Sequence, residues 1–497
     1  MTQENLPGPR GGLRAGAGGR LAAFLEATRV HGDVVCLNEE RRVFLISHPD
    51  HVKHVLQDHQ ANYRQNFRKK VLMGQQSLTL ASGEAWKQRR RLLQPLFNQQ
   101  RLAPLAPKVS AGTGRMLDRW AEPARRGEAV DVSQHFADLT LDLLIGDLLG
   151  SAGGRGTLRR SVTTAFDYFN ERVRNPDQLP LWVPTRRNLG MARALRGLAG
   201  DVRRTIAEHR ESAEPEGDLL SAMLSTRDEK TGQALNPEQI QDEIMMLLVM
   251  GHMTSAMAVT WTFFLLSRHP DAEERVRAEV ADVVGDRPAG YQDVAKLVYT
   301  RMVIEESLRL YPPSWTFTRV ALEDDAIGGY RIPAGSTVTL APWVTHRRPE
   351  LWPDPERFDP SRFETGRAER HRFAYYPFGG GPRVCIARDM AMMELPLILA
   401  TVLQRYRLRP AAGRSAAPVP GIVLRPRAGL WMKLEDAAAP SRETAAPPEL
   451  IPALLLGKPA DAPAFLRRAE AGRYTPIPRD EFLDRARRAA SGLAGMG

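Results

Sequence analysis

A stretch of 23 residues, Ile244–Leu266, contains no Asp, Glu, Lys or Arg, and it limits the possible folds more than any other feature of the chain. A helix that is apolar on all sides either crosses a membrane or lies in the core of a large protein. The stretch follows about 240 residues of ordinary globular composition and includes His, Ser and Thr. We therefore expect a buried core helix and no transmembrane segment.

The composition is that of an ordinary globular protein. Of the 497 residues, 43% are hydrophobic and 26% are charged, which excludes a wholly disordered, collagen-like or disulfide-scaffold protein. The chain has two cysteines, Cys36 and Cys385, and its amino terminus lacks the apolar core of a signal peptide. So few cysteines in so long a chain predict a cytoplasmic protein without disulfides.

The chain is basic, with a formal net charge of +11. Only nine of its 69 basic residues are Lys, and the Arg residues are dispersed along the chain instead of forming one block with aromatic residues. This pattern argues against nucleic-acid binding. A basic surface is better matched to an acidic protein partner.

Hydrophobic periodicity predicts a mainly α protein with small β-sheets, an α+β fold class. Helical periodicity dominates from about residue 51 to 280. Residues 341–384 are rich in Pro, Arg and aromatic residues without clear periodicity, which indicates a long ordered coil. The shorter elements that we expect are a hairpin in 33–49, a helix over Gln292–Leu310, strands around Ala326–Ile332 and Ser336–Leu340, and a closing strand pair within 421–436.

The segment PFGGGPRVCIARDMAMMEL, residues 377–395, carries the strongest chemical signal. A cysteine directly before a helix has its thiolate stabilised by the positive end of that helix. The glycines before Cys385 allow backbone N–H groups to turn towards the sulfur. Such a sulfur is either an axial iron ligand or a nucleophile.

The spacing Phe-x-x-Gly-x-Arg-x-Cys, formed by Phe378, Gly381, Arg383 and Cys385, resembles the haem-binding loop of the cytochrome P450 family. The resemblance extends over about residues 6–436 and is closest to the soluble bacterial type. It implies the cytochrome P450 fold, with haem between the long buried helix and the helix that follows the cysteine loop.

A second match is the pair Glu306 and Arg309 in EESLRL, which stand three residues apart on one helix face. In the family this pair is completed by an arginine from the coil, which we match to Arg357 in DPERFDPSRF. The resemblance implies that this triad has a structural role, in which it holds the coil that carries Cys385.

The resemblance also implies the haem contacts. Cys385 is expected to be the axial ligand of the iron of haem b. Trp86 and Arg90 lie one helical turn apart, so that an indole N–H and a guanidinium can meet one carboxylate of the haem. Because Arg89 and Arg91 are its neighbours, the register at Arg90 is open. The expected cofactor-binding residues are Trp86, Arg90, Arg319, Phe378, Arg383 and Cys385.

The buried helix contains MGHMTSA, where the family places an acid beside a threonine. By resemblance, Thr254 guides protons for the cleavage of O₂ and is the catalytic residue. The acid position is occupied by Met253, which departs from the family pattern. A second departure is Ala387, where the family usually has glycine. Protons can then come through ordered water, or the protein uses peroxide, rearranges its substrate, or is an idle haem protein that recruits a partner.

The function implied is that of a monooxygenase that hydroxylates or epoxidises a hydrophobic small molecule with O₂. Terpenoid, polyketide and lipid substrates are all open. Electrons are expected from a separate ferredoxin and ferredoxin reductase, so that NAD(P)H acts only indirectly. The basic residues around the cysteine, expected to suit an acidic ferredoxin, are Arg372, Arg383 and Arg388.

The expected domain organisation has one large body and a tail. Residues 1–20 are predicted to be a flexible N-terminal segment, and residues 21–436 the cytochrome P450 domain. Residues 437–449 form an Ala/Pro linker, and residues 450–497 a C-terminal extension of unknown role. The extension has apolar anchors and a predicted helix in 479–490. We expect it to pack against the body, although partner binding and a free tail remain open.

Overall fold

The computed structural model describes residues 7–8, 19–66, 74–150, 155–175, 178–180, 182–211, 217–364, 369–437, 465–468 and 474–477. Most of the N-terminal segment, the Ala/Pro linker and the helix predicted in 479–490 lie outside these residues. The domain boundaries and the packing of the extension therefore stay predictions.

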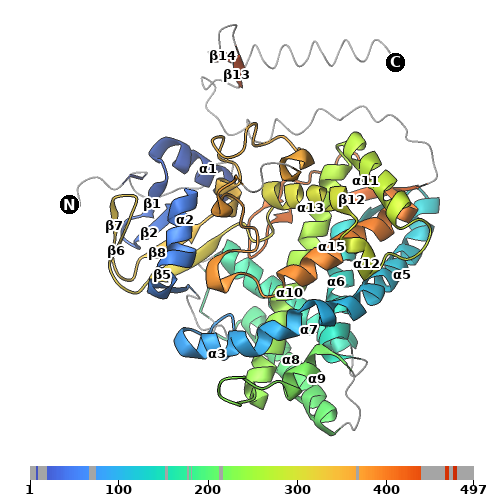
Figure 1. The fold of residues 1–497 in the computed structure, drawn as a ribbon, viewed down its shortest axis with the longest axis horizontal. Coiled ribbons are helices and arrows are strands. Elements are labelled where there is room, and N and C mark those ends of the chain that lie inside the picture. The colour runs from blue at the N-terminus through green and yellow to red at the C-terminus, as the bar shows by residue number, and fades with distance from the viewer. Residues whose placement is uncertain are drawn as a thin grey trace.

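Helices form most of the described protein, which confirms the predicted fold class (Figure 1). Helix α10 runs through the middle of the helical part, next to α6 and α15, and the β-sheet with α1 and α2 lies at the opposite side of the molecule. The α-helices are α1 (Gly19–His31), α2 (Pro49–Lys53), α3 (Gly83–Leu93), α4 (Gln99–Leu102), α5 (Ala106–Arg125), α6 (Val132–Leu149), α7 (Arg155–Arg174), α8 (Arg186–Glu211), α9 (Leu219–Ser225), α10 (Pro237–Leu266), α11 (Pro270–Val283), α12 (Tyr291–Val294), α13 (Val298–Leu310), α14 (Pro342–Thr345) and α15 (Arg388–Arg405).

The strands form small sheets. The largest has the order β1-β2-β8-β5-β3, from β1 (Val34–Asn38), β2 (Val43–Ile46), β8 (Thr337–Leu340), β5 (Phe317–Ala321) and β3 (Tyr63–Gln65). The others are β4-β12-β9, from β4 (Ala129–Asp131), β12 (Trp431–Asp436) and β9 (Tyr406–Pro410), and the pairs β6 (Asp325–Ile327) with β7 (Tyr330–Ile332), β10 (Pro418–Val419) with β11 (Arg425–Pro426), and β13 (Phe465–Arg468) with β14 (Tyr474–Ile477).

The expected hairpin in 33–49 is confirmed by antiparallel pairing of β1 with β2. The predicted helix over Gln292–Leu310 is wrong in one respect, because it is two helices, α12 and α13. The carboxylate of Glu279 caps the start of α13 by accepting the N–H groups of Tyr299 and Thr300 at 2.6 and 2.8 Å, which stabilises a new helix start there. The closing strand pair within 421–436 is also wrong, since β12 pairs with β9 and β4 instead.

Helix α10 contains the uncharged stretch. Asn236 and Gln239 form a reciprocal capping box at its start. The helix is long and apolar enough to cross a membrane, but 72% of its most apolar window is buried inside the protein. That burial favours the predicted core helix, because a soluble core helix passes the same length and composition test.

The pair Glu306–Arg309 lies in the core, and both side chains are 0% exposed. Nε of Arg309 lies 2.7 Å from Oε2 of Glu306. Arg309 also donates to three carbonyls of the coil, those of His346, Pro355 and Arg357, at 2.7 to 3.1 Å. The backbone N–H of Asp359 donates to Glu306 at 2.9 Å. The pair therefore ties α13 to the coil, as the resemblance implied.

The assignment of Arg357 as the third member of the triad is wrong. Its side chain is exposed, and it contributes its carbonyl to Arg309 instead of its guanidinium to Glu306. The guanidinium near Glu306 is that of Arg362, at 3.5 Å, with its side chain 11% exposed. Arg362 lies in a 3₁₀ turn, Pro360–Phe363, and this turn directs its side chain inwards towards α13.

We predict that Arg362→Ala destabilises the protein and Arg357→Ala does not. Removal of the Arg362 guanidinium takes a charged partner from a buried carboxylate, a loss of about 1–3 kcal/mol. Removal of the exposed Arg357 side chain keeps the carbonyl contact and changes stability by about 0.5 kcal/mol or less. Urea unfolding of the two haem-loaded variants measures the difference. Equal losses of unfolding free energy in the two variants would contradict the assignment of Arg362 as the third member of the triad.

Candidate functional site

The loop before α15 is a tight turn that places Cys385 at the start of that helix. The N–H of Cys385 donates to the carbonyl of Phe378 at 3.0 Å, and that of Val384 to Gly381 at 3.1 Å. Gly381 has a φ of +65°, a backbone conformation that L side chains rarely adopt. The predicted position of the cysteine directly before a helix is confirmed, with α15 beginning at Arg388.

Ala387 fits this turn although the family usually has glycine there. Its φ is −93°, so a side chain at this position causes no backbone strain. The departure at Ala387 therefore leaves the geometry of the cysteine loop intact.

Gly381 is also the point where the loop touches the rest of the protein. A Cβ atom on Gly381 would lie 1.9 Å from the carbonyl oxygen of Leu56, in the π-helical segment His54–Asp58. This segment and the turn Gly381–Arg383 are in direct contact. Only glycine allows the two backbones to approach so closely.

The Cys385 thiol is exposed, yet protein surrounds it. Burial raises the pKa of the thiol, while the N–H of Ala387 and the positive charges of Arg90 and Arg388 act in the opposite direction. A metal ion bound to the sulfur would hold it as the thiolate, because coordination deprotonates a thiol.

Three buried or half-buried arginines converge on the loop. Arg90 donates to the carbonyl of Val384 at 3.0 Å, and Arg383 donates to that of Ala81 at 2.9 Å. Arg319 is 5% exposed, and its guanidinium donates to the neutral oxygens of Gln65 and Thr318 at 2.7 and 3.0 Å.

In the described part of the chain, these arginines have no anionic partner. Burial lowers the pKa of Arg319 and of Arg383 to about 10, and the two charges repel each other. Within the described residues, none of the guanidinium groups of Arg90, Arg319 and Arg383 pairs with a carboxylate. Buried cations without anions are costly, so this cluster fits an anionic ligand.

Trp86 and its neighbours decide the open register on α3. The indole of Trp86 is 8% exposed, and the guanidinium of Arg383 lies 4.5 Å above its ring. Arg89 pairs instead with the buried Glu243 at 3.2 Å, and Arg91 with Asp228 at 2.9 Å. Arg90 is therefore the arginine of α3 that reaches the cysteine loop, which agrees with the expected register.

The residue types at this site fit a haem. A thiol that can ligate iron stands among arginines that can neutralise two carboxylates, and these are the groups that a haem presents. Cys385, Trp86, Arg90, Arg319 and Arg383 come together around one loop. Phe378 is half-buried, packs against the main hydrophobic core, and lines a hollow together with Arg388 and Met392.

One face of α10 is half-buried, whereas the other residues between 243 and 266 are buried. Its members are Leu247, Met250, Gly251, Thr254 and Ser255, which follow the helical repeat. Thr254 lies on this face, and its hydroxyl donates to the carbonyl of Gly251 at 3.0 Å.

His252 lies on the opposite side of α10. It is 2% exposed, with its ring against Phe166, and burial lowers its pKa to about 4. Its Nδ1 bonds the carbonyl of Leu248 at 2.8 Å. His252 is therefore a neutral packing residue, and at neutral pH it does not carry protons to Thr254.

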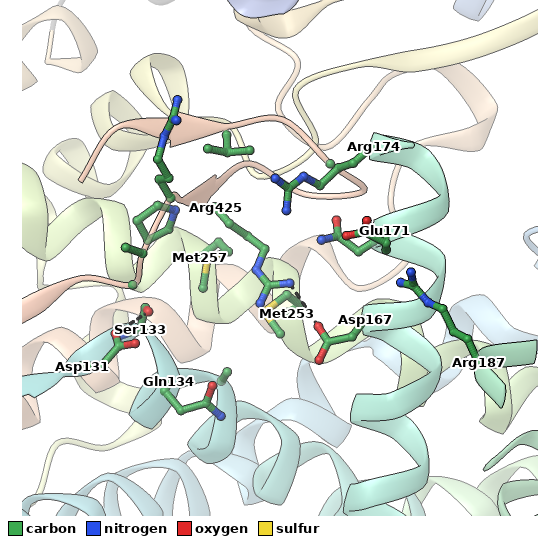
Figure 2. Close-up of a pocket in the computed structure, with 18 residues that line it drawn as sticks. Asp131, Ser133, Gln134, Asp167, Glu171, Arg174, Arg187, Met253, Met257 and Arg425 are labelled. Carbon is green, nitrogen blue, oxygen red and sulfur yellow. Dashed lines mark hydrogen bonds and ion pairs between the residues drawn. The ribbon is translucent and has the colours of Figure 1, made fainter. Parts of the chain in front are cut away.

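Met253 lies on one flank of Thr254 and lines a polar pocket of about 400 Å³ between α6, α7 and the segment 419–429 (Figure 2). Arg425 and Asp167 form an ion pair at 3.3 Å in this pocket, close to Met253. The thioether thus occupies the position where an acid would meet charged groups.

Ser255 lies on the other flank of Thr254, and sequence reasoning missed its partner. Its hydroxyl acts to lower the pKa of the Glu394 carboxyl on α15, a side chain that is 7% exposed. Burial, together with the nearby carboxyl of Asp147 on α6, raises the pKa of Glu394 to about 8, so this carboxyl holds a proton at neutral pH. The signal was present in the sequence as one acid inside the apolar run MAMMELPLIL.

Comparison with known proteins agrees with this geometry. A family model described as Cytochrome P450 matches residues 15–431. The chain is 35% identical over 397 residues to cyclooctat-9-en-7-ol 5-monooxygenase of Streptomyces melanosporofaciens, which covers 78% of this chain and 85% of the relative. It is 34% identical over 410 residues to cyclooctatin synthase of the same organism, covering 81% and 88%.

Solved structures show the same fold. The cytochrome P450DA heme domain matches with a TM-score of 0.78 at 23% identity, over 87% of this chain and 97% of that one. A retinoic acid-bound cyanobacterial CYP120A1 matches with a TM-score of 0.74 at 25% identity, over 83% and 93%.

We predict that Gly381→Ala loses haem, because its Cβ would overlap the Leu56 carbonyl and displace the cysteine loop. Gly413→Ala is the matched control, since Gly413 has a φ of +69° but nothing within 4 Å of its Cβ. It keeps the backbone strain, about 1–2 kcal/mol, without the overlap. The haem-to-protein ratio after purification measures the effect. Full haem content in Gly381→Ala would contradict the tight contact.

Proposed function

Because this chain belongs to the cytochrome P450 family and is a monooxygenase, we propose that it binds haem b and hydroxylates or epoxidises a hydrophobic cyclic substrate of secondary metabolism. One observation carries the haem assignment: the exposed Cys385 thiol stands among arginines that have no carboxylate partner within the part of the chain that the structure describes. The name of one relative, cyclooctat-9-en-7-ol 5-monooxygenase, favours a terpenoid-like cyclic alcohol as the substrate class.

Each residue of the site has a separate task in this proposal. A haem held by the Cys385 thiolate would supply the activation of O₂, and a thiolate ligand would favour O–O cleavage. Arg90, Arg319 and Arg383 neutralise and orient the haem carboxylates. Thr254 holds a proton at its hydroxyl on the half-buried face of α10. The apolar members of that face, Leu247 and Met250, suit a hydrophobic substrate.

We assign the electron donor to a separate ferredoxin with its NAD(P)H-dependent reductase. Arg372 and Arg388 are exposed and line the surface hollow of about 620 Å³ beside the cysteine loop, where an acidic protein can dock. Arg383, which we expected on the same face, turns to Ala81 and Trp86 instead. Its charge therefore serves the haem site and not the docking surface.

We assign proton supply to the Ser255 side of Thr254. Glu394 holds a proton in the core near Ser255, which directly follows Thr254 in the sequence. Asp147, whose pKa burial raises to about 6, lies beside Glu394, and the charges of Lys108 and Arg101 act on Asp147. This set of carboxyls connects the core to charged residues of α5 and α4. It takes the place of the acid that the family has at the position of Met253.

A second candidate function rests on Met253 alone. In this alternative, the lack of an acid beside Thr254 means that the protein uses peroxide, rearranges its substrate, or is an idle haem protein that recruits a partner. The relay through Ser255 and Glu394 favours the monooxygenase, because a reaction that consumes O₂ with electrons needs a supply of protons.

We predict a red-shifted Soret band in the reduced, CO-treated protein and its absence in Cys385→Ala. The thiolate of Cys385 causes the shift. Cys36 is buried in β1 and does not contribute to the Soret band. A ferredoxin and reductase supplied with NADPH should then add one oxygen atom to a cyclic alkenol, detected by mass spectrometry. Cys36→Ala is the matched control. A thiolate band without any such product would favour the second candidate.

We predict that Glu394→Gln lowers product formed per NADPH and raises peroxide release, because the amide holds the fold but supplies no acidic proton. Ser255→Ala should act alike, whereas Thr262→Ala, a buried hydroxyl that bonds its own helix, should not. Unchanged coupling in both Glu394→Gln and Ser255→Ala would exclude the relay.

A stability measurement separates this role from packing. The pKa of Glu394 is raised from 4.5 to about 8 in the folded protein, so the unfolded state releases this proton first as pH rises. Stability is therefore lost as pH rises through this window, by up to about 1.4 kcal/mol per pH unit. Glu394→Gln should remove that loss, and its melting temperature relative to the parent should rise between pH 5 and pH 8.

A further inference from the structure

Histidines gather in one short segment outside the haem site. Four of the 11 histidines of the chain, His48, His51, His54 and His59, lie in HPDHVKHVLQDH. The segment begins as α2 and continues as the π-helical turn His54–Asp58. π-Helical turns are rare and are often found at functional sites.

The π-turn brings two of these histidines together. The N–H of His59 donates to the carbonyl of His54 at 2.8 Å, the five-residue spacing of a π-helix. The two rings stack with their centroids 3.9 Å apart and 14° between their planes. In an α-helix, residues five apart point in different directions, so only the π-turn pairs these side chains.

A carboxylate from a distant part of the chain completes the group. Asp325 of β6 lies with its Oδ2 2.8 Å from Nε2 of His54. The hydroxyl of Tyr63 donates to the same oxygen at 2.7 Å, and the N–H of Ala326 donates to Oδ1 at 2.7 Å. The carboxylate is therefore held in one orientation by groups that are not themselves ligands.

We propose that His54, His59 and Asp325 bind a divalent transition-metal ion, with Zn²⁺ as the probe. One ligand atom from each residue lies within 4.8 Å of the others. Two imidazoles and one carboxylate are a donor set that Zn²⁺ uses, with a water in the fourth position. Tyr63 and Ala326 then act as the outer hydrogen-bonding partners that orient a ligating carboxylate.

Only small side-chain rotations are needed. Metal–ligand distances of about 2.0–2.1 Å place tetrahedral ligand atoms about 3.4 Å apart. The Nε2–Oδ2 distance of 2.8 Å must therefore widen slightly, and the ring of His59 must turn out of its stack. His59 is exposed and has room to turn, and the two other ligands are half-buried, so the ion would bind at an accessible edge.

The site is next to the cysteine loop. Leu56, within the same π-turn, contributes the carbonyl that touches Gly381. An ion that joins the π-turn to β6 would restrict this segment, and the segment supports the loop that carries Cys385. Metal binding is thus expected to stabilise the haem-loaded protein.

The test is titration of tag-free, haem-loaded protein with Zn²⁺, followed by calorimetry and by X-ray absorption at the zinc edge. We expect one ion per chain, a nitrogen- and oxygen-rich shell, and a melting temperature that rises with free Zn²⁺. His59→Ala, an exposed substitution that leaves the core alone, should weaken binding at least 10-fold. Tyr63→Phe should weaken it by about 10-fold or more through loss of the outer hydrogen bond.

His48→Ala is the matched control, because His48 lies in the same segment but outside the ligand group. It should bind Zn²⁺ as the parent does. Absence of one-to-one binding, or binding that survives in His59→Ala, would overturn the proposal and leave a hydrogen-bonded network. The haem spectrum and activity do not enter these readouts, so the outcome is independent of the proposed function.

Discussion

The buried ion pair between Glu306 and Arg309 is the interaction on which the rest of the site depends. The coil from residue 341 to 384 has little regular backbone pairing of its own, and a long coil needs external partners for its polar groups. Arg309 supplies them by binding carbonyls of His346, Pro355 and Arg357 from one guanidinium. Because that guanidinium is fully buried and neutralised by Glu306, it holds the coil against α13 at three carbonyls ahead of the cysteine loop.

The parts of this protein that follow from local spacing could be predicted from the sequence. The cysteine loop, the Glu306–Arg309 pair and the uncharged core helix each depend on residues within a few positions of one another. The third member of the triad could not, because Arg357 and Arg362 stand five residues apart in a coil without periodicity. Only the 3₁₀ turn at Pro360–Phe363, which directs Arg362 inwards, decides between them.

The groups that the sequence did not reveal are formed by contacts between distant elements. Glu394 becomes important through Ser255, more than a hundred residues away, and Asp325 through His54. His54 and His59 pair only because the backbone forms a π-turn where a regular helix would be expected. A sequence pattern records the residue types in such groups, but the helix faces and the backbone geometry that join them are tertiary properties.

The position of the acid follows from the two flanks of Thr254. On the Met253 flank the polar pocket contains the Arg425–Asp167 ion pair, and an acid there would be drawn to Arg425 and held ionised. On the Ser255 flank the core desolvates Glu394 and keeps it protonated, which is the state a proton donor needs. Glu394 lies on α15, nine residues after Cys385. One short segment of the chain therefore carries both the expected iron ligand and the proposed proton donor.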